Sequence, residues 1–335
     1  MPPKVVITNW VHPEVIKFLE PHCTLTANPS REPWSQQQVL EQVEDAVALM
    51  TYMPDTVNDA FLRQCSQLRI IACALKGYDN FDVEACTRRG VWLTIVPDLL
   101  SVPAAELTVG LLIGLARHVH EGDHFIRSGA FRGWRPLLYG TGLAGSTVGV
   151  FGMGAIGKAI AQRLHGFGCG ALLYYDERRL DPVAEQRLGL TCAPFRELVA
   201  QSDFLIISVP LSEQTHHKID DAVLKAMKPG AFLVNIARGS VVDEQAVADA
   251  LATGHLAGYA ADVFELEDWA RADRPRNIPQ LLLAQKDKTL LTPHLGSAVH
   301  RVRMQIEREA ARSIVQVLQG QRPDGAVNDP ISARA

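Results

Sequence analysis

Three side chains in the second half of the chain are of types that together could handle a small anion and a proton: Arg238, Glu267 and His294. Arg238 carries a fixed cation, and its guanidinium can hold an oxyanion through two parallel hydrogen bonds. His294 can accept or release a proton near neutral pH, and Glu267 could orient its imidazole. On the residues alone, a surface arginine, a structural histidine and a solvated loop carboxylate stay open as alternatives.

A glycine-rich run near the middle of the chain predicts a dinucleotide site. The pattern G-x-G-x-x-G occupies residues 152–157, between the apolar run 147–151 and a helical pattern. The glycines allow a tight turn and a close backbone approach to a pyrophosphate, and the helix N-terminus attracts its charge. Asp176 lies 19 residues after the last glycine, at the end of the next apolar run, where it would accept from ribose hydroxyls. The sequence therefore predicts NAD as the cofactor.

The composition is that of an ordinary globular protein. The 335 residues are 47% apolar and 21% charged, and the net charge of −4 gives no reason to expect nucleic acid or a membrane as a partner. The six cysteines are scattered without metal-ligand spacing, so we expect no metal site and a reducing, cytoplasmic environment. The start of the chain enters a strand pattern directly, with no apolar signal core.

Two series of alternating strand and helix patterns indicate an α/β protein with two Rossmann-like, doubly wound parallel-sheet domains and an active site in the cleft between them. The first series covers residues 1–98, and its predicted strands are 5–8, 46–52, 69–74 and 91–96. The second series begins at residue 147, and its predicted strands are 147–151, 171–175, 204–208, 231–235, 258–261 and 289–292.

Long helices connect the two series. One is expected from Ala104 to about Ile126, and a last helix from about Val299 to Leu318 would return to the first domain. The domains expected from this organisation are a substrate-binding (catalytic) domain over 1–100, completed by 301–335, and an NAD-binding Rossmann domain over 101–300.

Five phrases of the chain resemble, in order and spacing, the D-isomer-specific 2-hydroxyacid dehydrogenases. They are residues 75–82, 152–157, 235–243, 262–267 and 292–294. The resemblance covers nearly the whole chain, and it implies that Arg238, Glu267 and His294 occupy the catalytic positions of the family. It also implies that Asp262 holds the nicotinamide carboxamide and that residues 101–145 are a dimerisation arm, which predicts a homodimer.

The cofactor contacts that we expect lie in the glycine-rich run and after the strands of the second series. They are Gly152, Gly154, Ala155, Ile156, Gly157, Asp176, Glu177, Pro210, Ala237, Asp262 and Gly296. The nearby Arg178 and Arg179 leave the degree of NADP use open, because an arginine at this place can accommodate a 2′-phosphate. The remaining histidines, His216 and His217 among them, are interpreted as surface residues.

One position departs from the common pattern of the family in a way that bears on the substrate. Hydroxyacid dehydrogenases usually carry a small apolar residue where this chain has Lys76, in the loop that receives the substrate carboxylate. A second cation beside Arg238 favours a compact, multiply charged oxyanion over a monocarboxylate, and the alternative is a lysine that points into solvent.

Three phrases, residues 76–82, 90–98 and 265–275, closely resemble the phosphonate (phosphite) dehydrogenases. This resemblance implies an NAD-dependent oxidation of phosphite to phosphate. The substrate contacts that it implies are Lys76, Gly77, Met53, Arg303, Trp134, Tyr139 and Ser297. Ala104 replaces a threonine found in a close relative beside the nicotinamide.

Two other functions stay open on the sequence. A D-2-hydroxyacid dehydrogenase would use the same three catalytic residues on a C–H bond but leaves Lys76 unexplained. An NAD(H)-sensing corepressor, similar to the C-terminal binding proteins, would need a peptide-docking surface that the sequence does not reveal. Whether His294 or Arg238 is the general base also stays open, because their protonation depends on burial.

Overall fold

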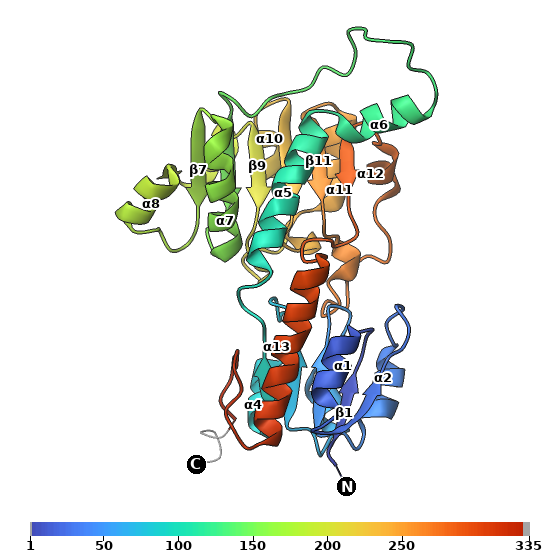
Figure 1. Cartoon of the computed structure of the whole chain (residues 1–335). Helices are drawn as coiled ribbons and strands as arrows, with labels where there is room; N and C mark the ends of the chain where they lie inside the picture. The colour runs from blue at the N-terminus through green and yellow to red at the C-terminus, as the bar shows by residue number, and fades with distance from the viewer. Residues whose placement is uncertain (1, 331–335) are drawn as a thin grey trace. The chain divides into compact units, whose positions relative to one another are not determined.

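The computed structural model describes residues 2–330, and the chain divides into two compact units, each with its own parallel sheet (Figure 1). Unit 1 comprises the described residues up to Leu100, residues 269–272, and those from Ser297 onward; unit 2 comprises the rest. Unit 1 thus includes the whole of the last helix and the three residues before it. It also includes the short insertion 269–272, which the sequence did not indicate. The predicted class of two parallel-sheet α/β domains is confirmed.

Unit 1 is a five-stranded parallel sheet in the order β2-β1-β3-β4-β5. Its strands are β1 (Lys4–Ile7), β2 (Thr24–Ala27), β3 (Ala48–Thr51), β4 (Ile70–Cys73) and β5 (Trp92–Thr94). Its helices are α1 (Pro13–Leu19), α2 (Gln36–Val43), α3 (Asp59–Arg63), α4 (Val83–Arg89) and α13 (His300–Leu318). One apolar cluster packs α1 and α13 against one face of the sheet, and another packs α2, α3 and α4 against the other face.

Unit 2 is a seven-stranded parallel sheet in the order β12-β11-β10-β9-β6-β7-β8. Its strands are β6 (Thr147–Phe151), β7 (Ala171–Tyr175), β8 (Leu190–Cys192), β9 (Phe204–Ile207), β10 (Ala231–Asn235), β11 (Leu256–Ala261) and β12 (Thr289–Leu291). Its longer helices are α5 (Ser101–Ala116), α6 (Val119–Arg127), α7 (Ala155–Leu164), α8 (Pro182–Leu188), α9 (Phe195–Gln201), α10 (Asp221–Ala226), α11 (Glu244–Ala252) and α12 (Gln280–Ala284). Three short 3-10 turns complete it: η1 (His165–Phe167), η2 (Gly239–Val241) and η3 (Glu265–Glu267).

The strands of unit 2 form a sheet buried on both faces, as parallel sheets require. The middle strands β9 and β10 are fully buried. The apolar helix α5 packs with α7 and β11 on one face of the sheet, and α11 packs with α12 and β11. Because all seven strands are parallel, the loops at their carboxyl ends gather along one edge of the sheet, where ligands of this architecture bind.

The predicted elements differ from the structure in two instructive places. The strands β2 and β8 were not expected, because edge strands of three or four residues leave little periodic signal. The single helix predicted from Ala104 to Ile126 is two helices, since His118 adopts a left-handed conformation with a φ of 52° between α5 and α6. Within residues 2–330 no single helix is long and apolar enough to cross a membrane. Helices α5 and α6 are long and apolar enough only when taken together, and the angle between them is 62°.

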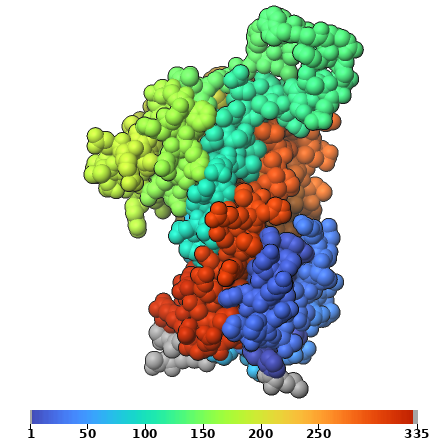
Figure 2. Space-filling view, in the orientation of Figure 1, coloured from blue at the N-terminus to red at the C-terminus, as the bar shows by residue number. Residues whose placement is uncertain are grey.

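The segment that follows α6, residues 128–145, projects from unit 2 as an extended arm, seen in green in Figures 1 and 2. Large apolar side chains of α6 and the arm are exposed, among them Ile126, Phe131, Trp134 and Tyr139. Such a series of exposed aromatic residues is unusual on a surface that contacts only water.

Candidate active site

The glycine-rich run forms the turn between β6 and α7, and its backbone requires glycine at two places. Gly152 has a φ of 98°, in the left-handed region that other residues rarely adopt. A Cβ at Gly157 would lie 2.2 Å from the carbonyl oxygen of Gly152, so only glycine lets the helix approach the strand this closely. A Cβ at Gly154 would meet no described atom within 4 Å. The turn therefore leaves open space beside the N-terminus of α7, as a bound pyrophosphate requires.

Asp176 follows β7 and is bonded to the glycine-rich turn. Its Oδ2 accepts a hydrogen bond of 2.6 Å from the backbone N–H of Met153, and its Oδ1 accepts one of 3.0 Å from the N–H of Arg178. The side chain is half-buried, and Glu177 beside it is exposed. Each carboxylate oxygen has a further lone pair, so Asp176 can still accept from ribose hydroxyls. The glycine turn and this carboxylate fit NAD, in agreement with the prediction.

The other predicted cofactor contacts lie at the carboxyl ends of successive strands of the same sheet. Pro210 follows β9, Ala237 follows β10, Asp262 follows β11 and Gly296 follows β12. The parallel sheet therefore brings residues from six strands, including β6 and β7, to one edge. Which of them touch the cofactor stays a prediction.

His294 and Glu267 form a close pair in unit 2. The His294 Nδ1 lies 2.7 Å from Oε2 of Glu267, and the other carboxylate oxygen of Glu267 accepts from the backbone N–H of Phe264 at 2.8 Å. With Nδ1 used in this way, Nε2 is the ring nitrogen that can exchange a proton with a substrate. His294 has a φ of 56°, a conformation that costs a non-glycine residue energy and that is concentrated at functional sites.

Asp262 holds the loop that carries His294. Its carboxylate, almost fully buried, accepts from the Thr292 hydroxyl at 2.6 Å and from the N–H groups of Leu295 and Gly296 at 2.6 and 2.8 Å. Burial raises the pKa of Asp262, while these donors lower it. The contacts that the structure shows for Asp262 are therefore those of a positioning residue, and its predicted contact with the carboxamide stays a prediction.

Arg238 immediately precedes the 3-10 turn η2 and is half-buried. The amide of Asn235 donates to the Arg238 carbonyl at 3.0 Å, and the guanidinium donates to the carbonyl of Ala237 at 2.9 Å. A Cβ at Gly239 would lie 1.8 Å from the carbonyl carbon of Phe264, so the Arg238 turn lies against the turn that carries Glu267. The structure thus brings the loops of all three predicted catalytic residues together within unit 2.

A group of buried acidic residues lies behind these loops, and sequence reasoning missed it. The N–H of Glu265 donates to Glu244 at 2.7 Å, and the N–H of Glu244 donates back to Glu265 at 3.1 Å. Asp268 accepts from the Ser240 N–H at 2.6 Å. Burial raises the pKa of Glu244 to about 8, and the neighbouring carboxylates add to the rise. Acidic residues at a helix start and in a loop are usually solvated, so the sequence contained no signal for this group.

His217 was interpreted as a surface residue; its side chain is 36% exposed, but it also makes contacts that the sequence did not indicate. Its Nε2 lies 2.8 Å from Oε2 of Glu265, and its backbone N–H donates to the Ser240 carbonyl at 2.7 Å. His217 is also left-handed, with a φ of 44°. A second histidine–carboxylate pair therefore supports the turn that carries Arg238.

In unit 1, the predicted substrate residues gather at the carboxyl ends of β3 and β4. Lys76 and Gly77 lie just after β4, and both are half-buried. Desolvation lowers the pKa of Lys76, and the charge of Asp98 opposes this. The amide of Asn80 donates at 2.9 Å to the carbonyl of Met53, which joins the end of β3 to the Lys76 loop. Lys76 is therefore partly desolvated, and its contact with the substrate stays a prediction.

Arg303 reaches the same place from α13. Its guanidinium donates at 3.2 Å to the carbonyl of Ala74, two residues before Lys76. It also lies 3.7 Å from the carboxylate of Glu307, which is buried and accepts from both the N–H and Nδ1 of His12 at 3.0 and 2.7 Å. Glu307 and His12 were not predicted, because 295 residues separate them in the sequence.

Two predicted substrate residues belong to unit 2, whereas Lys76 and Arg303 belong to unit 1. Trp134 and Tyr139 lie on the arm of unit 2, with 85% and 77% of their surfaces exposed. Ser297 belongs to unit 1, where it precedes α13. Within the described residues no group of histidine, cysteine or carboxylate side chains has the geometry of a metal site.

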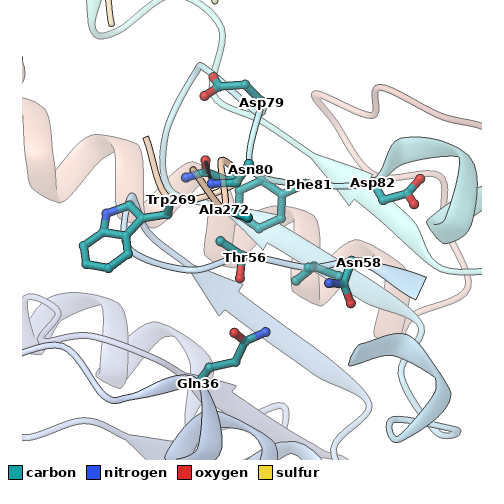
Figure 3. Close-up of a pocket in the computed structure, with 11 residues that line it drawn as sticks. Gln36, Thr56, Asn58, Asp79, Asn80, Phe81, Asp82, Trp269 and Ala272 are labelled. Carbon is teal, nitrogen blue, oxygen red and sulfur yellow. Dashed lines mark hydrogen bonds between the residues drawn. The ribbon is translucent and has the colours of Figure 1, made fainter. Parts of the chain in front are cut away.

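A separate hollow of about 390 Å³ lies on unit 1 (Figure 3). It is lined mainly by residues 79–82 before α4, the segment before α3, and the short insertion 269–272. The lining residues are Gln36, Thr56, Val57, Asn58, Asp79, Asn80, Phe81, Asp82, Trp269, Ala270 and Ala272. None of the predicted site residues is among them. The N–H of Ala270 donates to Asn80 at 3.3 Å, so this contact ties the insertion to residues 79–82.

Comparison with known proteins identifies the family. The model of the NAD-binding domain of D-isomer specific 2-hydroxyacid dehydrogenases matches residues 109–296. The chain is 37% identical to a glyoxylate reductase of Thermococcus litoralis, over 99% of this chain and 98% of that protein. It is 38% identical to a glyoxylate reductase of Pyrococcus furiosus, over 99% and 97% of the two chains.

The fold is also similar to that of solved structures. The crystal structure of the TT0316 protein from Thermus thermophilus superimposes with a TM-score of 0.87 at 32% identity, over 97% of this chain and all of that chain. The relatives from Thermococcus litoralis and Pyrococcus furiosus are both named glyoxylate reductase, so they favour the 2-hydroxyacid alternative over phosphite.

Proposed function

The chain belongs to the D-isomer specific 2-hydroxyacid dehydrogenase family, and we propose that within it the chain oxidises phosphite to phosphate with NAD. The observation that carries the proposal is Lys76, which is half-buried in the segment after β4, two residues from the carbonyl of Ala74 that accepts from the guanidinium of Arg303. Two cations at one strand end suit a doubly charged oxyanion such as phosphite better than a monocarboxylate. The resemblance of residues 76–82, 90–98 and 265–275 to phosphonate dehydrogenases supports the same substrate.

The reaction balances as phosphite + NAD⁺ + water → phosphate + NADH + H⁺. The P–H bond breaks, a bond forms between phosphorus and the water oxygen, and the water releases a proton. NAD, when bound, supplies the acceptor for the hydride. The glycine-rich turn and Asp176 would hold its pyrophosphate and its ribose.

Each group in the protein has one task in this proposal. Lys76, Arg303 and Arg238 hold the phosphite oxygens and lower the energy of the additional negative charge in the transition state. His294 takes the proton from the attacking water through Nε2, because Nδ1 is occupied by Glu267. Arg238 as the base is the minority alternative.

A second candidate is the oxidation of a D-2-hydroxy acid or the reverse reduction of glyoxylate. The names of the relatives favour it, and the same three residues would serve, with His294 exchanging the proton of a hydroxyl group. This function does not require a lysine at position 76.

A parallel assay distinguishes the candidates. The purified protein is incubated with NAD⁺ and phosphite, D-lactate or D-glycerate, and with NADH and glyoxylate, while the NADH absorbance is followed. We expect phosphite to be turned over far faster than the organic acids. Turnover of glyoxylate or D-glycerate as fast as phosphite would establish the second candidate, and no turnover at all would leave an NAD(H)-binding protein.

A variant tests whether Lys76 determines the preference for phosphite over the organic acids. The Lys76→Ala protein should lose phosphite oxidation much more than any activity on the organic acids. Lys17→Ala, which removes an exposed lysine of α1, is the matched control and should change neither. An equal loss for all substrates would mean that Lys76 supports the loop and does not select the substrate.

A further inference from the structure

The turn between β7 and α8 lies at the cofactor edge of unit 2 (Figure 1). Hydrogen bonds between its backbone and side chains stabilise its conformation. Asp176 accepts from the N–H of Arg178 at 3.0 Å, at the start of the turn. The N–H of Leu180, near its end, donates at 2.9 Å to the hydroxyl of Tyr174, a fully buried residue of β7. The two arginines that follow Asp176 therefore start from fixed backbone positions.

Arg179 is held by Glu185, which lies on α8. The guanidinium donates through Nε and a terminal nitrogen to the two carboxylate oxygens, at 2.9 and 3.0 Å. This is the paired geometry that makes arginine–carboxylate contacts strong. The side chain of Arg179 is 67% exposed and that of Glu185 only 12%, so the arginine covers a largely buried partner.

Tyr174 fixes that partner. Its hydroxyl donates to Oε1 of Glu185 at 2.6 Å while it accepts from Leu180. The Arg179 guanidinium and then the Tyr174 hydroxyl lower the pKa of Glu185 to about 2, so it is ionised throughout the neutral range. Arg178 differs: its side chain is exposed and makes no ion pair with the described part of the chain.

We propose that Glu185 is a determinant of cofactor selectivity, because it holds the Arg179 guanidinium away from the 2′-phosphate of NADP. An arginine after the acidic residue of the second strand is the group that accommodates this phosphate in dinucleotide sites. Here a phosphate must compete with a carboxylate that already accepts from two nitrogens of the guanidinium. Asp176 excludes the phosphate by repulsion, and Glu185 removes one of the two cations that could compensate. The proposal concerns the cofactor, so it holds whichever substrate is oxidised.

The experiment measures binding and needs no substrate. NADH and NADPH are titrated into the wild-type protein and the Glu185→Gln variant, and the nicotinamide fluorescence gives both dissociation constants. We expect Glu185→Gln to bind NADPH about tenfold more tightly and NADH unchanged, since one charge-assisted contact with the phosphate becomes available. Unchanged NADH binding also shows that the variant is folded.

Two double variants test whether the gain in NADPH affinity depends on Arg179. In Glu185→Gln/Arg179→Ala the gain for NADPH should vanish, and in the matched Glu185→Gln/Arg178→Ala it should persist. A gain that survives the loss of Arg179 would mean that only the removed negative charge matters, and it would overturn the proposal. The same holds if Glu185→Gln leaves NADPH binding as it was.

The single variant Arg179→Ala tests the proposal in the wild-type background. If Glu185 withholds this arginine, its removal leaves NADPH binding unchanged. A clear weakening of NADPH binding, with NADH unaffected, would show that Arg179 already reaches the 2′-phosphate and would refute the inference.

Discussion

Replacing Glu244 by glutamine should make the protein more stable at alkaline pH. Glu244 lies at the start of α11 with 1% of its surface exposed, and it accepts from the N–H of Glu265. Its second carboxylate oxygen is buried and has no hydrogen-bond partner within residues 2–330. Glutamine keeps the size and one acceptor oxygen, and it cannot ionise. The substitution therefore removes a charge while leaving the contact with Glu265 in place.

The magnitude follows from the pKa. Burial raises the pKa of Glu244 to about 8 from its usual 4.5, so between these values the folded protein binds a proton that the unfolded chain has lost. The free energy of unfolding therefore falls as the pH rises from 4.5 to about 8, and it levels off above. One pKa unit corresponds to about 1.4 kcal/mol, so the cost of the ionised form approaches about 5 kcal/mol above pH 8 and about 3 kcal/mol at pH 7.

The measurement is thermal and urea unfolding of the wild-type and Glu244→Gln proteins at pH 5 and pH 8. We expect nearly equal stability at pH 5, and at pH 8 an increase for the variant of several degrees in melting temperature. Glu213→Gln, which removes an exposed loop carboxylate of the same unit, should leave the pH dependence unchanged. A variant that is less stable than the wild type at pH 8 would refute the reasoning, because it would show that the ionised carboxylate is the stabilising form.

Four further predictions concern activity, cofactor and assembly. Lys76→Ala should raise KM for phosphite by about 10- to 100-fold, since a charge-assisted hydrogen bond is lost; an unchanged KM would place the lysine outside the site. His294→Ala should lower kcat by about 10²- to 10⁴-fold with NADH binding intact in a fluorescence titration. Asp176→Ala should raise kcat/KM for NADP, because a like charge beside the 2′-phosphate is removed. No gain would show that another residue controls the choice between NAD and NADP. We propose that residues 101–145, which comprise α5, α6 and the arm, mediate a homodimer through their exposed aromatic side chains. A monomeric mass in light scattering, or a dimer undisturbed by Trp134→Ser, would count against this proposal.

The sequence by itself was enough to predict the class of the fold and the chemistry of the cofactor site. Buried parallel strands appear as short apolar runs, and the glycines at 152, 154 and 157 follow one of them directly. The candidate catalytic residues were predictable for the same reason: Arg238 and His294 each follow a strand, and parallel strands place their carboxyl ends at one edge. Patterns of this kind depend only on residues that are neighbours in the sequence, so they can be recognised without the structure.

Only the tertiary structure decided which polar residues support these groups. Glu244 and Glu265, 21 positions apart, each donate a backbone N–H to the carboxylate of the other, and His12 contacts Glu307 across 295 positions. Whether a glutamate is solvated, buried and protonated, or paired with Arg179 as Glu185 is, depends on neighbours that the chain brings together from a distance. Desolvation and ion pairing act through space, so residues identical in type have opposite pKa shifts: that of Glu185 falls and that of Glu244 rises.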